Sequence, residues 1–248
     1  MKSTLVILTA CSIVFCTVTA GLAQAPKVPW VSLFNGQDLA GWKKVGSNGH
    51  VEAVDGMIVC HQVVNTPMHT LFHTEKTFGD FILEMDVMTD PGFSSGILFR
   101  CAEQEPNSQR KTRDASLYGY QAKIDPSKRA WTGGIYDYFG KTFDWLYPLD
   151  KDERARKAYK IGEWNHFRIE AIGTTLKVWV NGVPTSHLIH DKYRQGYIAL
   201  KIHSLKDQPE KEKNLGRFKN IKILTDQLEE HRQAMDIPAR VVAATSEK

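Results

Sequence analysis

The chain of 248 residues has only four cysteines, and two of them, Cys11 and Cys16, fall in an apolar N-terminal segment. The other two, Cys60 and Cys101, lack the short spacings that mark metal or redox motifs. In an exported protein they could form one disulfide, and two buried free thiols are an equally good alternative. The cysteines therefore indicate no metal or redox site.

The sequence also lacks a strong charge of one sign. The formal net charge is +4, and no cluster of lysines and arginines is interleaved with aromatic side chains. Nucleic-acid-binding surfaces need such a cluster, so we expect no nucleic-acid partner. The balance of charges instead indicates a surface of mixed sign. The sequence shows no evident internal repeat.

The longest apolar run lies at the N-terminus and is short for a bilayer span. A basic start, an uncharged apolar stretch and the small residues that follow predict a signal peptide over residues 1–25. Cleavage after Ala20, Ala23 or Ala25 fits this pattern, and we expect a secreted or periplasmic protein without a membrane span. A lipoprotein box at Leu8 to Cys11 is a weaker alternative, because it lies too early in the segment.

Apolar and polar residues alternate with a period of two through most of the remaining chain. The alternation is clearest in five stretches, at residues 81–88, 166–173, 175–183, 196–203 and 216–224. Turn residues separate such runs, and Asn181-Gly182 is a strong hairpin signal. Many short strands with few helical stretches predict an all-β sandwich or jelly roll.

Two segments depart from the alternation. Residues 141–164 are rich in charged and aromatic side chains, and they predict a long loop with one helical turn around 152–159. Long loops in compact domains are often functional. Residues 227–248 have a helix-forming composition up to Pro238 and predict a peripheral tail with a short helix.

Several predicted strands carry polar side chains opposite an apolar face. These side chains are Gln121, Lys123 and Asp125 on one strand, Lys201 and His203 on another, and Arg100 at the end of a third. Two interpretations are open. The sheet has one solvated face, which is common in antiparallel structures, or a concave face binds a polar ligand.

Aromatic residues are available to cover such a ligand, namely Trp131, Tyr136, Trp145 and Trp179. Trp179 falls on the polar side of its strand, where a large ring needs a cover. A sugar suits this combination, because its hydroxyls need fixed donors and acceptors and the C–H face of its ring packs on an aromatic side chain.

Three short motifs match known chemical patterns, but their context argues against each. Residues 92–96 fit the pattern of a serine nucleophile, which needs a helix after it, whereas a strand follows here. His69 and His73 have the spacing of helical zinc ligands, but on a strand they would lie about 13 Å apart. His187 and His190 are also closely spaced, and they too are expected to be ordinary histidines and not metal ligands. We therefore expect no metal or cofactor, although acidic and histidine residues on the candidate face leave a divalent cation open.

Taken together, the motifs along the predicted strands and turns resemble those of the 3-keto-disaccharide hydrolase domain family of secreted bacterial proteins. The matching motifs run in order from Trp30 to about Thr225 and include SLFNGQDLAGW, FGDFILEMDV, SSGILFR, YGYQAKID, WTGGIYD, GEWNHFRIEAIG, LKVWVNGV, YIALKIHS and FKNIKI. The resemblance implies a concanavalin A-like jelly-roll β-sandwich of two antiparallel sheets over residues 26–226. For some members it also implies action on glycosides oxidised at C3.

The implied chemistry explains why polar groups would gather on one face. A ketone at C3 acidifies the proton at C2, so a base can remove that proton and the C1 substituent then leaves by β-elimination. Water that adds across the new double bond completes a net hydrolysis. Such a site needs a base, a donor or cation near the C3 oxygen, and an acid for the leaving oxygen.

Each role has candidates in the sequence. We expect the catalytic residues to be His203 or Asp125 as the base, with Lys123, and the substrate-binding residues to be Arg100, Gln121, Tyr136, Lys201, Trp131 and Trp179. The family usually has a carboxylate at the position of Gln121 or Lys123, and its absence here puts activity in question. The alternatives are a non-catalytic carbohydrate-binding module and a laminin-G-like interaction domain. The sequence does not indicate an oligomeric state.

Overall fold

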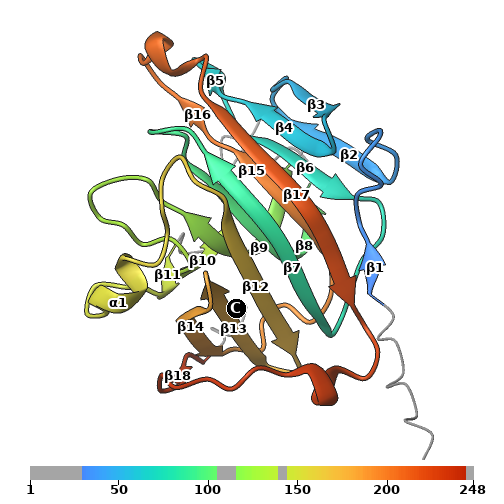
Figure 1. The fold of residues 1–248 in the computed structure, drawn as a ribbon, viewed down its shortest axis with the longest axis vertical. Coiled ribbons are helices and arrows are strands. Elements are labelled where there is room, and N and C mark those ends of the chain that lie inside the picture. Colours follow the sequence, from blue (N-terminus) through green and yellow to red (C-terminus); the bar gives the residue numbers. More distant parts are fainter. Residues whose placement is uncertain (1–29, 105–115, 139–143, 244–248) are drawn as a thin grey trace, which may run out of the picture.

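A computed structural model describes residues 30–104, 116–138 and 144–243. Within these ranges the chain forms two large, mainly antiparallel sheets that pack face to face as a β-sandwich (Figure 1). The predicted all-β sandwich is confirmed.

The first sheet, sheet A, has nine strands in the order β18-β14-β13-β12-β7-β17-β4-β3, with β1 also paired to β17. Its strands are β1 (Val31–Ser32), β3 (Val51–Val54), β4 (Met57–His61), β7 (Phe81–Thr89), β12 (Asn165–Ile172), β13 (Thr175–Val180), β14 (Val183–Ile189), β17 (Leu215–Leu224) and β18 (Arg240–Val241). The short β18 is parallel to β14, while the other pairs are antiparallel.

The second sheet, sheet B, has seven strands in the order β11-β10-β9-β8-β15-β6-β2. Its strands are β2 (Trp42–Gly46), β6 (Thr70–Thr74), β8 (Ser95–Gln104), β9 (Ser116–Ile124), β10 (Ile135–Tyr138), β11 (Trp145–Tyr147) and β15 (Tyr197–Ile202). A small parallel pair, β5 (Val63–Val64) and β16 (Ser204–Leu205), continues beside one end of the sandwich.

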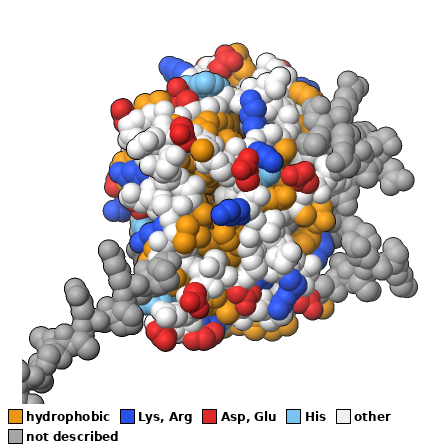
Figure 2. Space-filling model, turned by 90° about the vertical axis from the view of Figure 1, so that its right-hand side faces the viewer, with side chains coloured by type: hydrophobic (Ala, Val, Ile, Leu, Met, Phe, Trp, Pro, Cys, Tyr) orange, Lys and Arg blue, Asp and Glu red, His pale blue; other side chains and the backbone are white. Residues whose placement is uncertain are grey.

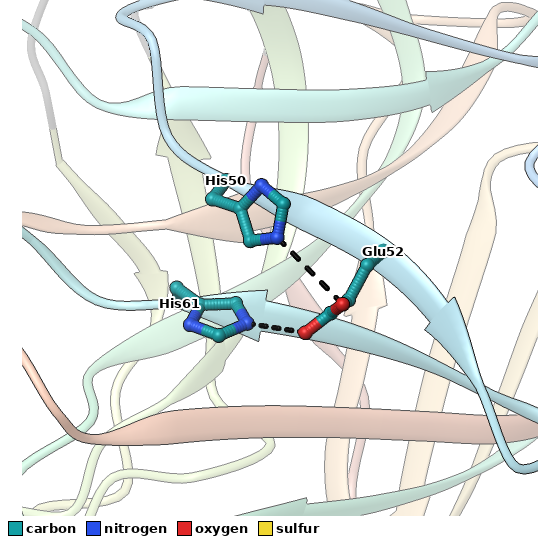
Figure 3. A group of neighbouring side chains, drawn as sticks. All are labelled: His50, Glu52 and His61. Atoms are coloured by element: carbon teal, nitrogen blue, oxygen red, sulfur yellow. Dashed lines mark hydrogen bonds and ion pairs between the residues drawn. The ribbon is translucent and has the colours of Figure 1, made fainter.

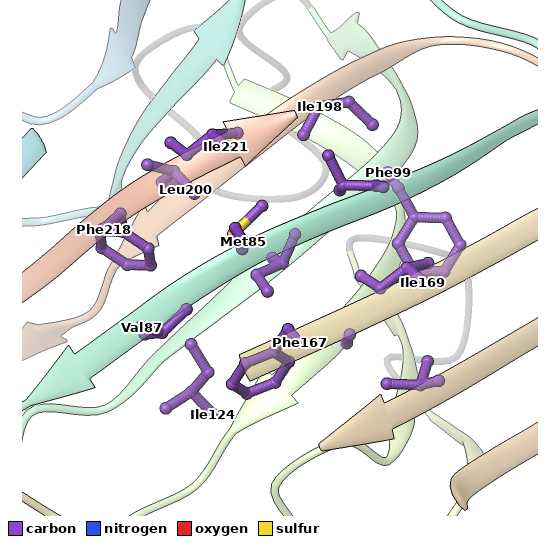
Figure 4. Close-up of a cluster of buried hydrophobic side chains, with 14 of the residues drawn as sticks. Met85, Val87, Phe99, Ile124, Phe167, Ile169, Ile198, Leu200, Phe218 and Ile221 are labelled. Atoms are coloured by element: carbon purple, nitrogen blue, oxygen red, sulfur yellow. The ribbon is translucent and has the colours of Figure 1, made fainter. Parts of the chain in front are cut away.

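The core lies between the two sheets, because alternation turns every second side chain inward. Figure 4 shows the packing: Met85, Val87, Phe167, Ile169, Phe218 and Ile221 of sheet A meet Phe99, Ile124, Ile198 and Leu200 of sheet B. All are buried. Burial of each such side chain contributes about 1.5–3 kcal/mol, so this layer is the main source of stability.

The predicted turns and irregular segments are found with one adjustment. Asn181 and Gly182 both have positive φ, 52° and 75°, as a tight hairpin between β13 and β14 requires. The predicted helical turn is α1 (Glu153–Arg156), whose first turn is capped by the side chain of Asp152. The tail carries 3-10 helix η3 (Leu228–His231) followed by extended chain and β18, not a longer helix. A further 3-10 turn, η2 (Pro209–Lys211), precedes β17.

Both cysteines of the β-sandwich are free and buried. Of the two alternatives, the structure therefore has the pair of buried thiols. No helix within the described ranges is long and apolar enough to cross a membrane. Figure 2 shows basic and acidic side chains interspersed with apolar ones on one face of the molecule, in line with the expected surface of mixed sign.

Candidate functional site

The polar side chains predicted from alternation gather on the outer face of sheet B, the face turned away from the core. On β9, Tyr120, Ala122 and Ile124 enter the core, so Gln121 and Lys123 point outward.

On β15, Ile198, Leu200 and Ile202 are core residues, so Lys201 points outward, and His203 follows the strand. Gly96 of β8 is the register partner of both Lys123 and Lys201. Three neighbouring strands thus bring the two lysines to either side of a residue without a side chain.

Two histidines lie beside these lysines. His203 and His69 have ring centroids 4.1 Å apart, because β15 and β6 pair antiparallel with Ile202 opposite Thr70. We call His69, Lys123, Lys201 and His203 the lysine–histidine cluster.

The backbone of Ser204 sets the tautomers of both rings. The Ser204 N–H donates to His69 Nδ1 over 2.9 Å, so that nitrogen carries no proton. The Ser204 carbonyl lies 2.7 Å from His203 Nδ1 and can only accept, so His203 Nδ1 carries the proton. In their neutral forms His69 has a donor at Nε2 and His203 has a lone pair there.

The surroundings keep both rings neutral. Burial, with the positive charges of Lys201 and Lys123, lowers the pKa of His203 to about 3. Burial, followed by the charges of Lys201, His203 and Lys123, lowers the pKa of His69 well below its ordinary value. The cluster therefore pairs a proton donor with a proton acceptor at neutral pH.

The two lysines are held without a carboxylate partner among the described residues. Lys123 Nζ donates to Ser94 Oγ and to the carbonyl of Ser95, over 2.7 and 3.1 Å. Lys201 Nζ lies 4.8 Å from the ring centroid of Tyr138, and Lys201 is only 5% exposed. Burial lowers the pKa of Lys123 to about 8. Burial, and then the charge of Lys123, lowers the pKa of Lys201 well below its ordinary value.

Gln121 lies next to the cluster with its amide unused. It is 1% exposed, and neither its Nε2 nor its Oε1 has a hydrogen-bond partner in the part of the chain that the structure describes. The amide rests on Gly96, where any added Cβ would collide with it. Buried polar groups nearly always have partners, so this amide is suited to a ligand hydroxyl.

An aromatic wall of Trp131, Tyr136 and Trp145 borders the face beyond Gln121. Tyr136 is the register partner of Gln121, and its ring lies 5.2 Å from that of Trp145. Trp131 meets Trp145 edge-on at 4.8 Å. The wall gives the outer face an apolar margin.

Asp125 supports this wall and is not aligned as a base. Its Oδ2 accepts from Arg129 Nε over 2.7 Å, and the Arg129 guanidinium lies 4.9 Å from the ring centroids of both Trp131 and Trp145. Burial raises the pKa of Asp125, but hydrogen bonds from Ser127 and Arg129 outweigh that effect and leave the pKa below its ordinary value. Both carboxylate oxygens already accept hydrogen bonds, from Ser127 N–H and Arg129 Nε, whereas His203 keeps its Nε2 lone pair, and this favours His203 as the base.

Arg100 does not lie on the outer face, contrary to the sequence prediction. A β-bulge between Phe99 and Ala102, with Arg100 at φ 48°, turns its side chain inward. There the guanidinium donates to the carbonyls of Gly79, Ala171, Gly173 and Tyr193 and pairs with Asp80 at 2.8 Å. These bonds tie strand ends together, so Arg100 has a structural role.

Trp179 is also away from the cluster. It points outward from β13, which belongs to sheet A, on the opposite side of the sandwich. The C-terminal tail provides its cover: Trp179 is 1% exposed and lines a cavity of about 420 Å³ with residues of the tail, Gln233 to Asp236. The expected cover exists, but it is protein and not ligand.

The sequence prediction missed His69 and Tyr138. His69 was set aside because its spacing to His73 fits no metal site on a strand, and its real partner is His203, brought alongside by the pairing of β6 with β15. The available signal was that His69 directly precedes one predicted strand and His203 directly follows another, because antiparallel pairing of the two strands would bring these residues together. Residues 92–94 lead from a turn into β8, as predicted, and His190 forms a hydrogen bond of 2.7 Å with the Tyr120 hydroxyl.

Comparisons with known proteins agree with the fold and with the motifs. The model of a family of 3-keto-alpha-glucoside-1,2-lyase-like domains matches residues 29–224. It confirms the resemblance read from the sequence. Among curated proteins the chain has no significant sequence match.

Solved structures share the fold at low sequence identity. A "putative glycosyl hydrolase" of Parabacteroides distasonis is 20% identical, with a TM-score of 0.52 over 79% of this chain and 99% of that one. A Bacillus subtilis protein with a galectin-like fold is 14% identical, with a TM-score of 0.52 over 79% of this chain and 94% of that one. The carbohydrate binding module CBM66 of B. subtilis is 14% identical, with a TM-score of 0.50 over 74% and 95%.

Proposed function

Because the chain belongs to the family of 3-keto-alpha-glucoside-1,2-lyase-like domains, we propose that it cleaves glycosides oxidised at C3. The C2 proton is removed and the C1 substituent leaves by β-elimination, after which water adds to complete a net hydrolysis. The lysine–histidine cluster on the outer face of sheet B is the reaction site.

The observation that carries this proposal is the pair of neutral histidines with opposite tautomers beside two lysines. His203 Nε2 takes the C2 proton. His69 Nε2–H donates a hydrogen bond to a substrate oxygen, and the protonated His203 that results from the first step can pass its proton to the leaving oxygen. Lys201 and Lys123 stabilise the negative charge that develops on the C3 oxygen.

The lysines also adjust the strength of the base during the reaction. Burial, and then the charges of the two lysines, hold the pKa of His203 down while the site contains no anion. When an enolate forms beside them, its charge offsets theirs, and His203 retains a proton more easily. The base therefore becomes stronger as the transition state is reached, which favours catalysis over ground-state binding.

The remaining residues of the face orient the sugar. The unpartnered amide of Gln121 binds a hydroxyl, and the aromatic wall of Trp131, Tyr136 and Trp145 covers the C–H face of the ring. No carboxylate occupies the positions of Gln121 and Lys123. Elimination does not require a carboxylate there, because a neutral imidazole can act as the base.

The direct test is incubation with 4-nitrophenyl 3-keto-glucosides of both anomeric configurations. Release of nitrophenol is expected from at least one of them, and the unoxidised 4-nitrophenyl glucosides serve as matched controls. In deuterated water, recovered substrate or product should carry deuterium at C2. Release from the unoxidised glucosides at the same rate would exclude the ketone-dependent mechanism.

A non-catalytic carbohydrate-binding function is the second candidate. The aromatic wall beside a buried unpartnered amide favours it equally, because binding needs only these groups. Calorimetry that detects sugar binding, together with no aglycone release from any 3-keto-glucoside, would favour this function.

We further propose that the protein is exported, with a mature N-terminus between Gly21 and Pro26. The basis is the pattern of residues 1–25, which lie outside the described residues. N-terminal sequencing of protein from the culture medium or periplasm tests it, and a mature chain that still begins at Met1 would contradict it.

A further inference from the structure

A second group of chemically reactive side chains lies at the edge of sheet A. His50 directly precedes β3, Glu52 lies on β3, and His61 ends β4. The two strands pair antiparallel with Val51 opposite Cys60, and the His61 N–H donates to the carbonyl of His50. His50 and His61 are therefore cross-strand neighbours, and Glu52 is two residues from His50 on the same face.

The three side chains converge on one point. Figure 3 shows both imidazole rings turned toward the Glu52 carboxylate. His61 Nε2 lies 2.7 Å from Glu52 Oε1, and His50 Nε2 lies 3.7 Å from Glu52 Oε2. One donor atom from each residue lies within 4.8 Å of the other two.

These separations match what a metal ion requires. Zinc binds imidazole nitrogen and carboxylate oxygen at about 2.0–2.2 Å in tetrahedral geometry, which puts neighbouring donor atoms about 3.3 Å apart. The two observed separations fall on either side of that value. Small rotations of exposed side chains would bring them to it, since the side chains of His50, Glu52 and His61 are 63%, 40% and 34% exposed.

Space for further ligands adjoins the group. A cavity of about 360 Å³ is lined by His50, His61, Gln62, Thr66 and Glu212, among others. A water molecule or a substrate oxygen can reach a metal ion from this side. An open fourth position is typical of zinc held by three protein ligands.

From this geometry we propose that His50, Glu52 and His61 bind a divalent transition-metal ion, with Zn²⁺ as the best fit. Two imidazoles and one carboxylate suit zinc and related ions, whereas Ca²⁺ and Mg²⁺ prefer oxygen ligands alone. This metal site is independent of the reaction proposed above, although it lies close to the lysine–histidine cluster. Gln62, which follows His61, donates from its amide to the carbonyl of His203.

The test is calorimetric titration of untagged, chelator-treated protein with ZnCl₂. One Zn²⁺ per chain is expected. His50→Ala, Glu52→Gln and His61→Ala should each weaken binding by more than the about 10–100-fold that loss of an outer-shell partner costs. Thermal unfolding should show a zinc-dependent rise in Tm in the wild type that is reduced or lost in these three variants, because a ligand of the folded state stabilises it.

A matched control is His166→Ala. His166 Nδ1 lies 2.9 Å from Asp86 Oδ1, so it forms the same kind of exposed histidine–carboxylate pair, but Asp86 is also bound by the Asn220 amide, which offers no second imidazole. This variant should bind Zn²⁺ as the wild type does. Zinc binding that is absent from the wild type, or unchanged in His61→Ala and Glu52→Gln, would overturn the proposal.

Discussion

His69 and His203 face each other with ring centroids 4.1 Å apart, and the peptide groups around Ser204 give the two rings opposite tautomers. One ring presents a proton and the other a lone pair on their Nε2 atoms. The backbone at Ser204 thus prepares a hydrogen-bond donor and a base, without any carboxylate in the described part of the cluster.

Replacing His203 with alanine should lower turnover of a 3-keto-glycoside by about two to four orders of magnitude, the usual contribution of acid–base catalysis. Turnover is measured by aglycone release, and far-ultraviolet circular dichroism checks that the fold is kept. His166→Ala is the control and should keep full turnover. If Asp125→Asn abolishes turnover while His203→Ala does not, Asp125 is the base. Wild-type rates for both variants would refute the mechanism.

Lys201→Met should raise stability and lower turnover. The buried amine has no carboxylate partner among the described residues, so an apolar side chain of similar length removes a desolvation cost of about 1–3 kcal/mol. Urea unfolding measures the gain. Lys222→Met is the comparison, because Lys222 is 41% exposed and pairs with Glu84 at 2.9 Å, and it should show no gain. A less stable Lys201→Met protein would argue against an unpaired charge at this position.

Gln121→Leu should raise KM without loss of stability, because leucine removes two unpartnered polar atoms from a buried position. Asn165→Leu is the matched opposite. The Asn165 amide bonds to Lys160, Glu163 and Asn181 on both its oxygen and its nitrogen, so its loss should cost several times the about 1 kcal/mol of one hydrogen bond. A Gln121→Leu protein with unchanged KM would show that the amide does not contact substrate.

Stability should fall between pH 7 and pH 5 partly because of His203. The folded protein lowers the pKa of this ring from 6.5 to about 3, so below pH 6.5 the unfolded chain takes up a proton that the folded chain does not. Stabilisation from the neutral ring is therefore complete above that pH and lost as the pH falls, by about 2 kcal/mol at pH 5.

Urea unfolding of the wild type and of His203→Gln at several pH values checks this. The variant should lose less stability across the interval by about that amount. Identical pH profiles for the two proteins would mean that His203 is not held neutral by the fold.

Arg100→Met should destabilise the protein by about 3–5 kcal/mol, because the hydrogen bonds from this buried guanidinium each contribute about 1–3 kcal/mol and several are lost together. The guanidinium satisfies four carbonyls and Asp80, all of which would lose a donor. Because Arg100 lies off the reaction face, the folded fraction should keep the KM of the wild type. If fully folded Arg100→Met protein had a raised KM, Arg100 would have to contact the substrate.

The alternation of residues predicted which side chains face outward, but not which strands lie side by side. Gln121, Lys123 and Lys201 were assigned to the correct faces, because period two is a local property. The role of His69 depends on the pairing of β6 with β15, which local periodicity does not specify. Trp179 was misplaced for the same reason. The alternation correctly predicted that it points outward, but it lies on sheet A and not on the sheet that carries the cluster.

Arg100 was misassigned for a different reason. A simple alternation continues through the end of β8, and only the bulge between Phe99 and Ala102 reverses it. Arg100 adopts a positive φ although it is not a glycine, so the residue type at this position does not predict the bulge. The tight hairpin at Asn181-Gly182, in contrast, was predictable because its residue types favour that backbone.

The link between Ser204 and His69 joins positions 135 residues apart in the chain. Contacts of such long sequence separation require a large loop to close before they form, so they tend to be slow steps in folding. The lysine–histidine cluster therefore cannot form in any intermediate that lacks the β6–β15 pair. During synthesis the chain must be complete past Ser204 before the two imidazoles meet, and activity recovered on refolding should follow the slowest kinetic phase that docks these strands.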